Sequence, residues 1–243
     1  NGKKIIVVDS VSTTDLEQVI LAMQKSNYNI LPVGTAAAAK VLSNEWFPPN
    51  EEEEVLPVKL PKLPKFIVSG SATQITANQI DKLEQSDEFD ENSLIIELDM
   101  NTVLSGVTQN LVDRIVSNLG NDNIVLVHTS KLIRNFDGFA EDTIKADLTK
   151  SGLANVITDF LSELTKEVLN RKKAILITLG GETAYKCCNI INANQLKLID
   201  EVVPAIALSR SVNSNQWIIT KSGNLGGVNT LIDILKYLTK HEE

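Results

Sequence analysis

Apolar runs alternate with helix-like periods over most of the chain, from about Lys65 to the end. Near-continuous apolar runs are typical of strands that are covered on both faces of a parallel sheet. The pattern predicts such strands at residues 66–68, 94–98, 124–127 and 174–178. Helical spacing between the runs predicts helices at 79–83, 111–119 and 153–169. In the longest helix one stripe holds Leu153, Val156, Ile157, Phe160, Leu161, Leu164 and Val168.

The last part of the chain has a different pattern. Residues 201–209 and 216–220 read as two strands close together in sequence, and a final helix is predicted at about 228–238. Strands this close favour antiparallel pairing. We therefore expect an α/β fold, a Rossmann-like three-layer sandwich with a mostly parallel sheet and an antiparallel edge.

The first part of the chain carries too few elements for a core of its own. Strands are predicted at 4–8 and 30–33, with a helix at 14–25 after a capping box that spans Thr14 to Glu17. The glycine and alanines from Gly34 onward predict a turn and a second helix. Two strands and two helices bury little surface, so we expect residues 1–47 to expose apolar side chains.

Residues 48–64 hold five of the seven prolines and a block of four glutamates. This composition excludes a helix interior or a central strand and predicts a linker. The acidic block can be read as a partner-binding segment or, more simply, as a solvated spacer. The expected organisation is thus 1–47, a linker at 48–64, and an α/β domain at 65–243.

Composition and charge narrow the function classes. The net charge of −8 argues against nonspecific binding of nucleic acid or anionic membranes. No apolar run reaches the roughly 20 residues needed to cross a bilayer. The two cysteines, Cys187 and Cys188, are adjacent and provide no disulfide framework. We expect a cytoplasmic protein.

Three segments rich in glycine and hydroxyl groups each follow a predicted strand. In an open α/β sheet, loops at the carboxyl ends of parallel strands line the ligand crevice, and glycine lets backbone N–H groups approach an anion. The helix that starts near Glu182 adds its positive dipole end. The candidate phosphate-binding residues are Ser69, Ser71, Gly180, Gly181, Glu182, Thr183, Lys221, Ser222, Gly223 and Gly226. At Gly181 we expect a positive φ and close approach of phosphate.

Simpler readings of the same segments stay open. The glycines can serve plain turns, Lys221 can be a solvent-exposed lysine, and Thr76 with Gln79 can form a capping box. No G-x-x-x-x-G-K-[ST] or G-x-G-x-x-G motif is present, and the two histidines form no metal-binding or triad pattern. His128 ends a predicted strand, so it is either structural or part of the crevice wall. We expect no protein-bound metal cluster.

The order of the motifs resembles the carboxyl-terminal nucleotide-binding domain of the four-carbon acid sugar kinases, once called domain of unknown function 1537. The motifs are SGS with T-x-x-Q at 69–79, GGET at 180–183 and TKSGNLG at 220–226. Residues 1–47 are similar to the end of the family's amino-terminal, acid-sugar-binding domain. The family's Ala-Asp-Asp-x-Thr-Gly-Ala motif is absent from this sequence.

This resemblance implies a kinase that uses ATP and Mg²⁺ to phosphorylate a hydroxyl of a four-carbon sugar acid, such as threonate, erythronate or 3-oxo-tetronate. It implies that the catalytic residues lie on an amino-terminal domain that is missing here and would be a partner of this chain. A homo-oligomer is left open as a further partner. Glu182 and Leu225 stand where the family commonly has Asp and Phe. The alternatives are a non-catalytic nucleotide- or anion-binding α/β module and, more weakly, an NAD-dependent oxidoreductase.

Overall fold

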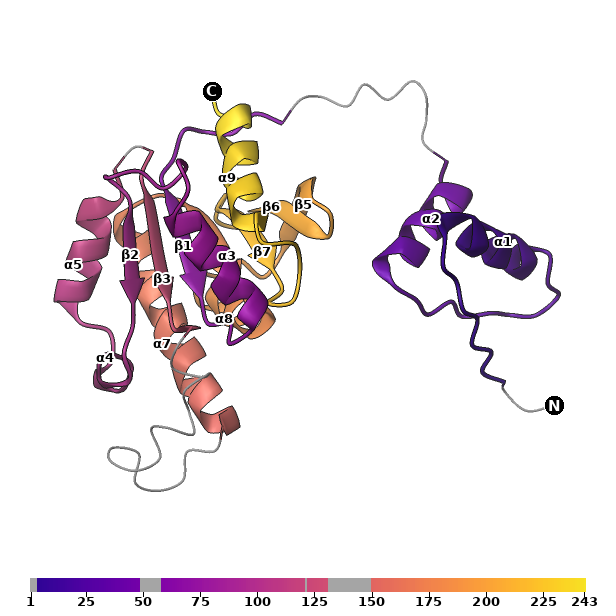
Figure 1. The fold of residues 1–243 in the computed structure, drawn as a ribbon, viewed down its shortest axis with the longest axis horizontal. Coiled ribbons are helices and arrows are strands. Elements are labelled where there is room, and N and C mark those ends of the chain that lie inside the picture. Colours follow the sequence, from indigo (N-terminus) through magenta and orange to yellow (C-terminus); the bar gives the residue numbers. More distant parts are fainter. Residues whose placement is uncertain (1–3, 49–57, 121, 131–149) are drawn as a thin grey trace. The chain divides into compact units, whose positions relative to one another are not determined.

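The structure, a computed structural model, describes residues 4–48, 58–120, 122–130 and 150–243. The chain divides into two compact units, Asn1–Pro57 and Val58–Glu243 (Figure 1). Most of the predicted linker, residues 49–57, lies outside the described ranges. Within them, no helix is both long and apolar enough to cross a membrane.

The first unit contains two helices that pack on each other, α1 (Thr13–Gln24) and α2 (Ala36–Trp46). Both predicted helices are therefore confirmed. The capping box is not where it was predicted: Ser12 is the N-cap, its hydroxyl accepts the N–H of Asp15, and the Asp15 carboxylate accepts the N–H of Ser12. A serine with a short acidic partner three residues on satisfies two helix-start donors at once.

The strands predicted at 4–8 and 30–33 are wrong, because neither segment is extended into a ladder. A strand needs a hydrogen-bonded neighbour, and the described part of the first unit supplies none. The β-branched side chains remain in solvent: Ile5 is 94% exposed and Val33 is 91% exposed.

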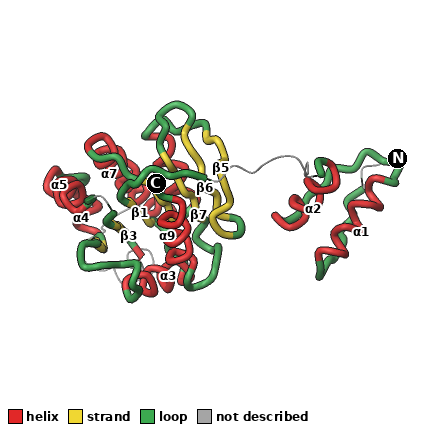
Figure 2. Tube along the Cα trace, turned by 90° about the horizontal axis from the view of Figure 1, so that it is seen from above, coloured by secondary structure: helices red, strands yellow, loops and turns green. Residues whose placement is uncertain are grey.

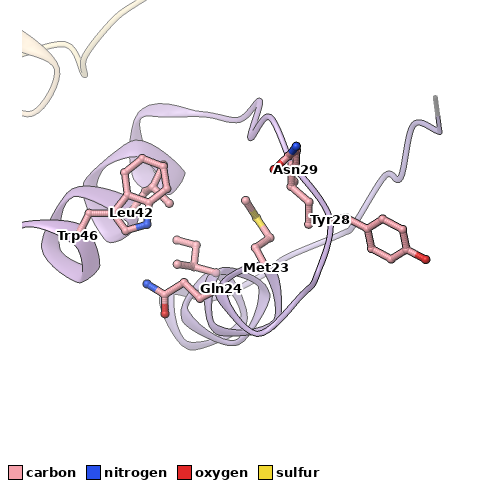
Figure 3. Close-up of a pocket in the computed structure, with 8 residues that line it drawn as sticks. Met23, Gln24, Tyr28, Asn29, Leu42 and Trp46 are labelled. Carbon is pink, nitrogen blue, oxygen red and sulfur yellow. The ribbon is translucent and has the colours of Figure 1, made fainter.

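A pocket of about 300 Å³ belongs to the first unit (Figure 3). Its wall combines side chains from α1, from α2 and from the segment between them, namely Ile20, Met23, Gln24, Tyr28, Asn29, Ile30, Leu42 and Trp46. The ring of Tyr28 points away from the hollow. None of the lining residues is charged.

The second unit is built on a seven-stranded sheet in the order β2-β3-β1-β4-β7-β6-β5. The strands are β1 (Lys65–Ser69), β2 (Leu94–Glu97), β3 (Ile124–His128), β4 (Ile175–Leu179), β5 (Leu196–Val203), β6 (Ile206–Ser211) and β7 (Trp217–Lys221). The ladders from β2 to β7 are parallel, and β6 pairs antiparallel with both β7 and β5. The prediction of a mostly parallel sheet with an antiparallel edge is confirmed.

Helices cover both faces of this sheet, which gives three layers (Figure 1). They are α3 (Gln74–Glu84), α4 (Met100–Ser105), α5 (Gln109–Asn118), α7 (Lys150–Arg171), α8 (Gly181–Ile190) and α9 (Thr230–His241). One core cluster joins the sheet to α4, α5, α7 and α8, and the other joins it to α3 and α9, which lie side by side (Figure 2). Every residue of β1, β3 and β4 is buried, so their sequences read as unbroken apolar runs.

The strand predicted at 201–209 is in fact two strands. β5 and β6 meet at a turn of Pro204 and Ala205, where Ala205 has a φ of 64°. Proline has no N–H for a ladder and fixes its own φ, so it ends β5. The capping box predicted at Thr76 is also wrong, because Thr73 caps α3 and accepts the N–H of Thr76.

The carboxyl-terminal residues contact the segment where β1 begins. The Lys65 Nζ lies 2.6 Å from the Glu242 Oε1, and both side chains are at most 10% exposed. The backbone of Leu60 donates to His241 and accepts from Glu243. The start of β1 is therefore tied to the end of α9.

Candidate nucleotide-binding site

The three candidate loops follow three neighbouring parallel strands. The sheet order places β1, β4 and β7 side by side, and their registers align Ser69 with Leu179 and Leu179 with Lys221. All three strands point the same way, so their carboxyl ends share one edge of the sheet. The predicted convergence of the loops is present.

The loops touch one another closely enough that glycine is required. A Cβ on Gly70 would lie 2.5 Å from the Thr183 Oγ1, and a Cβ on Gly223 would lie 2.5 Å from the Ser71 Oγ. Real Cβ atoms do not come this near to other heavy atoms. The first loop therefore packs directly against the second and the third.

The second loop differs from the expectation at its double glycine. Gly180 has the positive φ, 116°, and serves as the N-cap of α8. Gly181 has no such angle, and a Cβ there would meet nothing within 4 Å. Gly180 thus makes the turn, while Gly181 borders open space.

The start of α8 offers unused donors. Gly180 supplies no side-chain cap, and the first helical hydrogen bond runs from the Ala184 N–H to the Gly180 carbonyl. The N–H groups of Gly181, Glu182 and Thr183 have no acceptor among the described residues. Such groups, together with the helix dipole, favour a bound anion. The Glu182 side chain is exposed in this first turn.

Lys221 is neither in the loop nor in solvent. It is the last residue of β7, its side chain is 1% exposed, and its Nζ donates to the Ser222 carbonyl at 3.0 Å. Burial lowers the pKa of Lys221 to about 8. No carboxylate pairs with it in the described part of the chain. A buried amine beside the third loop is well placed to compensate an anion.

The serines of the first loop play different parts. Ser69 is fully buried, and its Oγ has no hydrogen-bond partner in the described part of the chain. The Ser71 Oγ lies 3.1 Å from the Thr73 Oγ1. Ser222 is exposed. Gly226 has a φ of 81° and lies against Thr230, so a Cβ on Gly226 would overlap the Thr230 Oγ1. The backbone angle of Gly226 and its close approach to Thr230 both favour glycine here.

Other candidate groups lie outside this cluster. His128 is the last residue of β3, which flanks β1 on the side opposite β4. The His128 Nδ1 is 3.0 Å from the Ser130 Oγ. Burial raises the pKa of Cys187 to about 12, which keeps it a thiol. Within residues 4–48, 58–120, 122–130 and 150–243, no three His, Cys, Asp or Glu side chains gather as metal ligands.

Three residues of the site were not recognised from the sequence as parts of it. Thr73, Thr76 and Gln79 all donate to backbone carbonyls of the third loop. A signal for them existed, since Thr73, Thr76 and Gln79 repeat every three residues and so continue the side of the helix that carries Ile80 and Leu83.

Comparison with known proteins decides the family. The model of a nucleotide-binding C-terminal domain matches residues 66–231. The chain belongs to this family. The resemblance to the nucleotide-binding domain of the four-carbon acid sugar kinases is thereby confirmed.

Named relatives cover almost the whole chain. D-threonate kinase of Salmonella typhimurium is 24% identical over 98% of this chain and 55% of its own length. D-erythronate kinase of Heliobacterium modesticaldum is 21% identical over 98% of this chain and 54% of its own length. The chain spans about half the length of the curated relatives it matches. At family level, these names support a kinase.

A solved structure shares the fold. A Haemophilus influenzae protein described as a DUF1537 member superposes with a TM-score of 0.63 and 17% identity, covering 96% of this chain and 52% of that one. The nucleotide-binding domain of this family thus has the α/β fold described above.

Proposed function

We propose that the loops after β1, β4 and β7 bind the phosphates of ATP, and that this chain supplies the ATP-binding half of a kinase for a four-carbon sugar acid. The observation that carries the proposal is the convergence of three glycine-bearing loops on one sheet edge. Donors without acceptors are available there from α8, and the nearby cation, Lys221, has no acidic partner among the described residues.

The residues fit a polyphosphate better than a sugar acid alone. Backbone N–H groups at a helix start and a buried amine neutralise charge in several directions, as phosphoryl transfer requires. Gly181 leaves room beside these donors. Mg²⁺ in such sites is held by phosphate oxygens and one or two carboxylates, and Glu182 is the carboxylate on the first turn of α8.

Each part of the chain has its own role in this proposal. The loop amides and Lys221 bind and orient the phosphates, and the sugar acid and the catalytic residues belong to an amino-terminal domain. Residues 1–47 are proposed as the end of that domain. The exposed apolar side chains of the first unit, such as Ile5, Val7 and Leu31, support this assignment.

Calorimetry with the 243-residue chain tests the proposal. Mg²⁺ with ATP or ADP should bind, while NAD and D-threonate alone should give no heat of binding. No phosphorylated acid should form, because the catalytic residues are assigned to the other half. Binding of NAD in place of ATP would favour the oxidoreductase alternative. Binding of inorganic phosphate as tightly as ATP would favour a plain anion-binding module.

A further inference from the structure

One polar stripe of α3 faces the third loop. Thr73, Thr76 and Gln79 are three residues apart, so they share one side of the helix start. Thr76 and Gln79 are fully buried, whereas Asn78 on the same helix is exposed. Polar side chains are rarely buried without partners, and these have partners more than 140 residues away in sequence.

The stripe holds alternate carbonyl groups of the loop. The Thr73 Oγ1 and the Thr76 Oγ1 both donate to the Gly223 carbonyl, at 2.7 and 2.9 Å. The Gln79 Nε2 donates to the Leu225 carbonyl at 3.1 Å and to the Gly227 carbonyl at 2.8 Å. Four hydrogen bonds thus fix three carbonyl groups.

Among the backbone groups of residues 223–227 that no described residue engages, the donors outnumber the acceptors, which are the carbonyls of Asn224 and Gly226. The N–H groups of Gly223, Asn224, Gly226 and Gly227 have no acceptor among the described residues. A loop in which most carbonyls are engaged and most N–H groups are unused favours an anion over a cation. The loop needs this outside support, because glycine fixes its own backbone poorly.

A second feature of the Gln79 amide distinguishes a role in positioning the third loop from a role in stabilising the fold. The Gln79 Oε1 is buried and has no hydrogen-bond partner among the residues that the structure describes. An unmatched buried acceptor is unfavourable, which offsets the stabilisation from the two hydrogen bonds of the amide, so an apolar side chain of similar size should change the stability little. Stability by itself therefore does not account for glutamine here.

From these contacts we infer that Thr73, Thr76 and Gln79 are positioning residues, which hold the third loop by its carbonyl groups so that its N–H groups are presented to phosphate. This inference rests on the proposed function. It adds that the phosphate affinity of the third loop is set by side chains of α3 that do not touch the nucleotide.

Variants of the full chain test this. Gln79→Leu removes both donors to the loop, and Thr76→Val removes a hydroxyl while keeping the shape. Thr76→Ser keeps the hydroxyl, and Asn78→Ala changes the exposed side of the same helix. Thr73 is left in place because its side chain also caps α3. Binding of ATP with Mg²⁺ is measured by calorimetry, unfolding by urea, and the amides of 222–227 by hydrogen exchange.

Gln79→Leu and Thr76→Val should each weaken ATP binding about tenfold, which corresponds to about 1.4 kcal/mol. Hydrogen exchange in 222–227 should become faster in both, with an unchanged urea midpoint for Gln79→Leu. Thr76→Ser and Asn78→Ala should match the parent. If the parent binds ATP and the Gln79→Leu and Thr76→Val variants bind it equally well, this inference is overturned and the proposed function is not. A parent that binds no nucleotide would overturn the proposed function and this inference with it.

Discussion

Replacing Lys221 by methionine should stabilise the protein at neutral pH and weaken its binding of nucleotide. The lysine side chain is 1% exposed, and among the described residues its Nζ donates only to the Ser222 carbonyl. Methionine fills a similar volume without a charge. The substitution therefore removes a buried cation and leaves the packing nearly unchanged.

The magnitude follows from the pKa of Lys221, which burial lowers from 10.5 to about 8. Each pKa unit corresponds to 1.36 kcal/mol, so the buried charge disfavours folding by roughly 3 kcal/mol at pH 7. Losing the hydrogen bond to Ser222 offsets about 1 kcal/mol of the gain. We expect Lys221→Met to raise the free energy of unfolding by about 2 kcal/mol.

The pH dependence has a definite sign. The folded pKa lies below the unfolded one, so between pH 8 and 10.5 the unfolded chain binds more protons. The charge penalty is complete below pH 8 and is relieved as the pH rises toward 10.5. The advantage of the methionine variant over the parent should accordingly shrink across this interval.

Urea unfolding of both proteins at pH 7 and pH 10 measures this difference, and calorimetry at pH 7 measures ATP binding. Comparing the two proteins cancels the other groups that titrate at high pH. If the variant is no more stable at pH 7 and the difference does not change with pH, Lys221 is not an uncompensated buried cation. A stabilised variant that still binds ATP like the parent would remove Lys221 from the site.

Three further results are expected. Gly181→Val should fold normally, because a Cβ there meets nothing within 4 Å, yet bind ATP at least tenfold more weakly, as calorimetry with Gly181→Ala for comparison would show; equal affinity would return the double glycine to a simple turn. Glu242→Ala leaves the charge of Lys65 buried and should lower the urea unfolding free energy by about 3 kcal/mol, while Asp122→Ala, at an ion pair more than half exposed, should change it by less than about 1 kcal/mol; similar losses would mean that the burial of the pair is unimportant. Cys187, whose pKa burial raises to about 12, should resist alkylation at pH 8 until urea unfolds the chain, and rapid labelling of the native protein would refute its burial.

Much of the second unit could be predicted because its pattern is local. β1, β3 and β4 are buried on both faces and read as unbroken apolar runs, and α7 carries one apolar stripe. These signals reflect burial of each side chain, which is a property of short stretches. The same signals failed at residues 4–8 and 30–33, because a β-prone sequence forms a strand only where a neighbouring strand accepts it.

Within the second unit, the sequence by itself indicated most of the strands and helices, and that glycine-bearing loops follow three of the strands. Only the tertiary structure decided that β1, β4 and β7 are neighbours, so that the Ser71 Oγ comes to lie beside Gly223. It also decided that Lys221 is buried and that Gln79 holds a loop 146 and 148 residues further along the chain. Periodicity reports which residues of one helix or strand are buried. Sheet order and long-range hydrogen bonds depend instead on how segments distant in sequence pack, and on which groups then lie near each buried polar group.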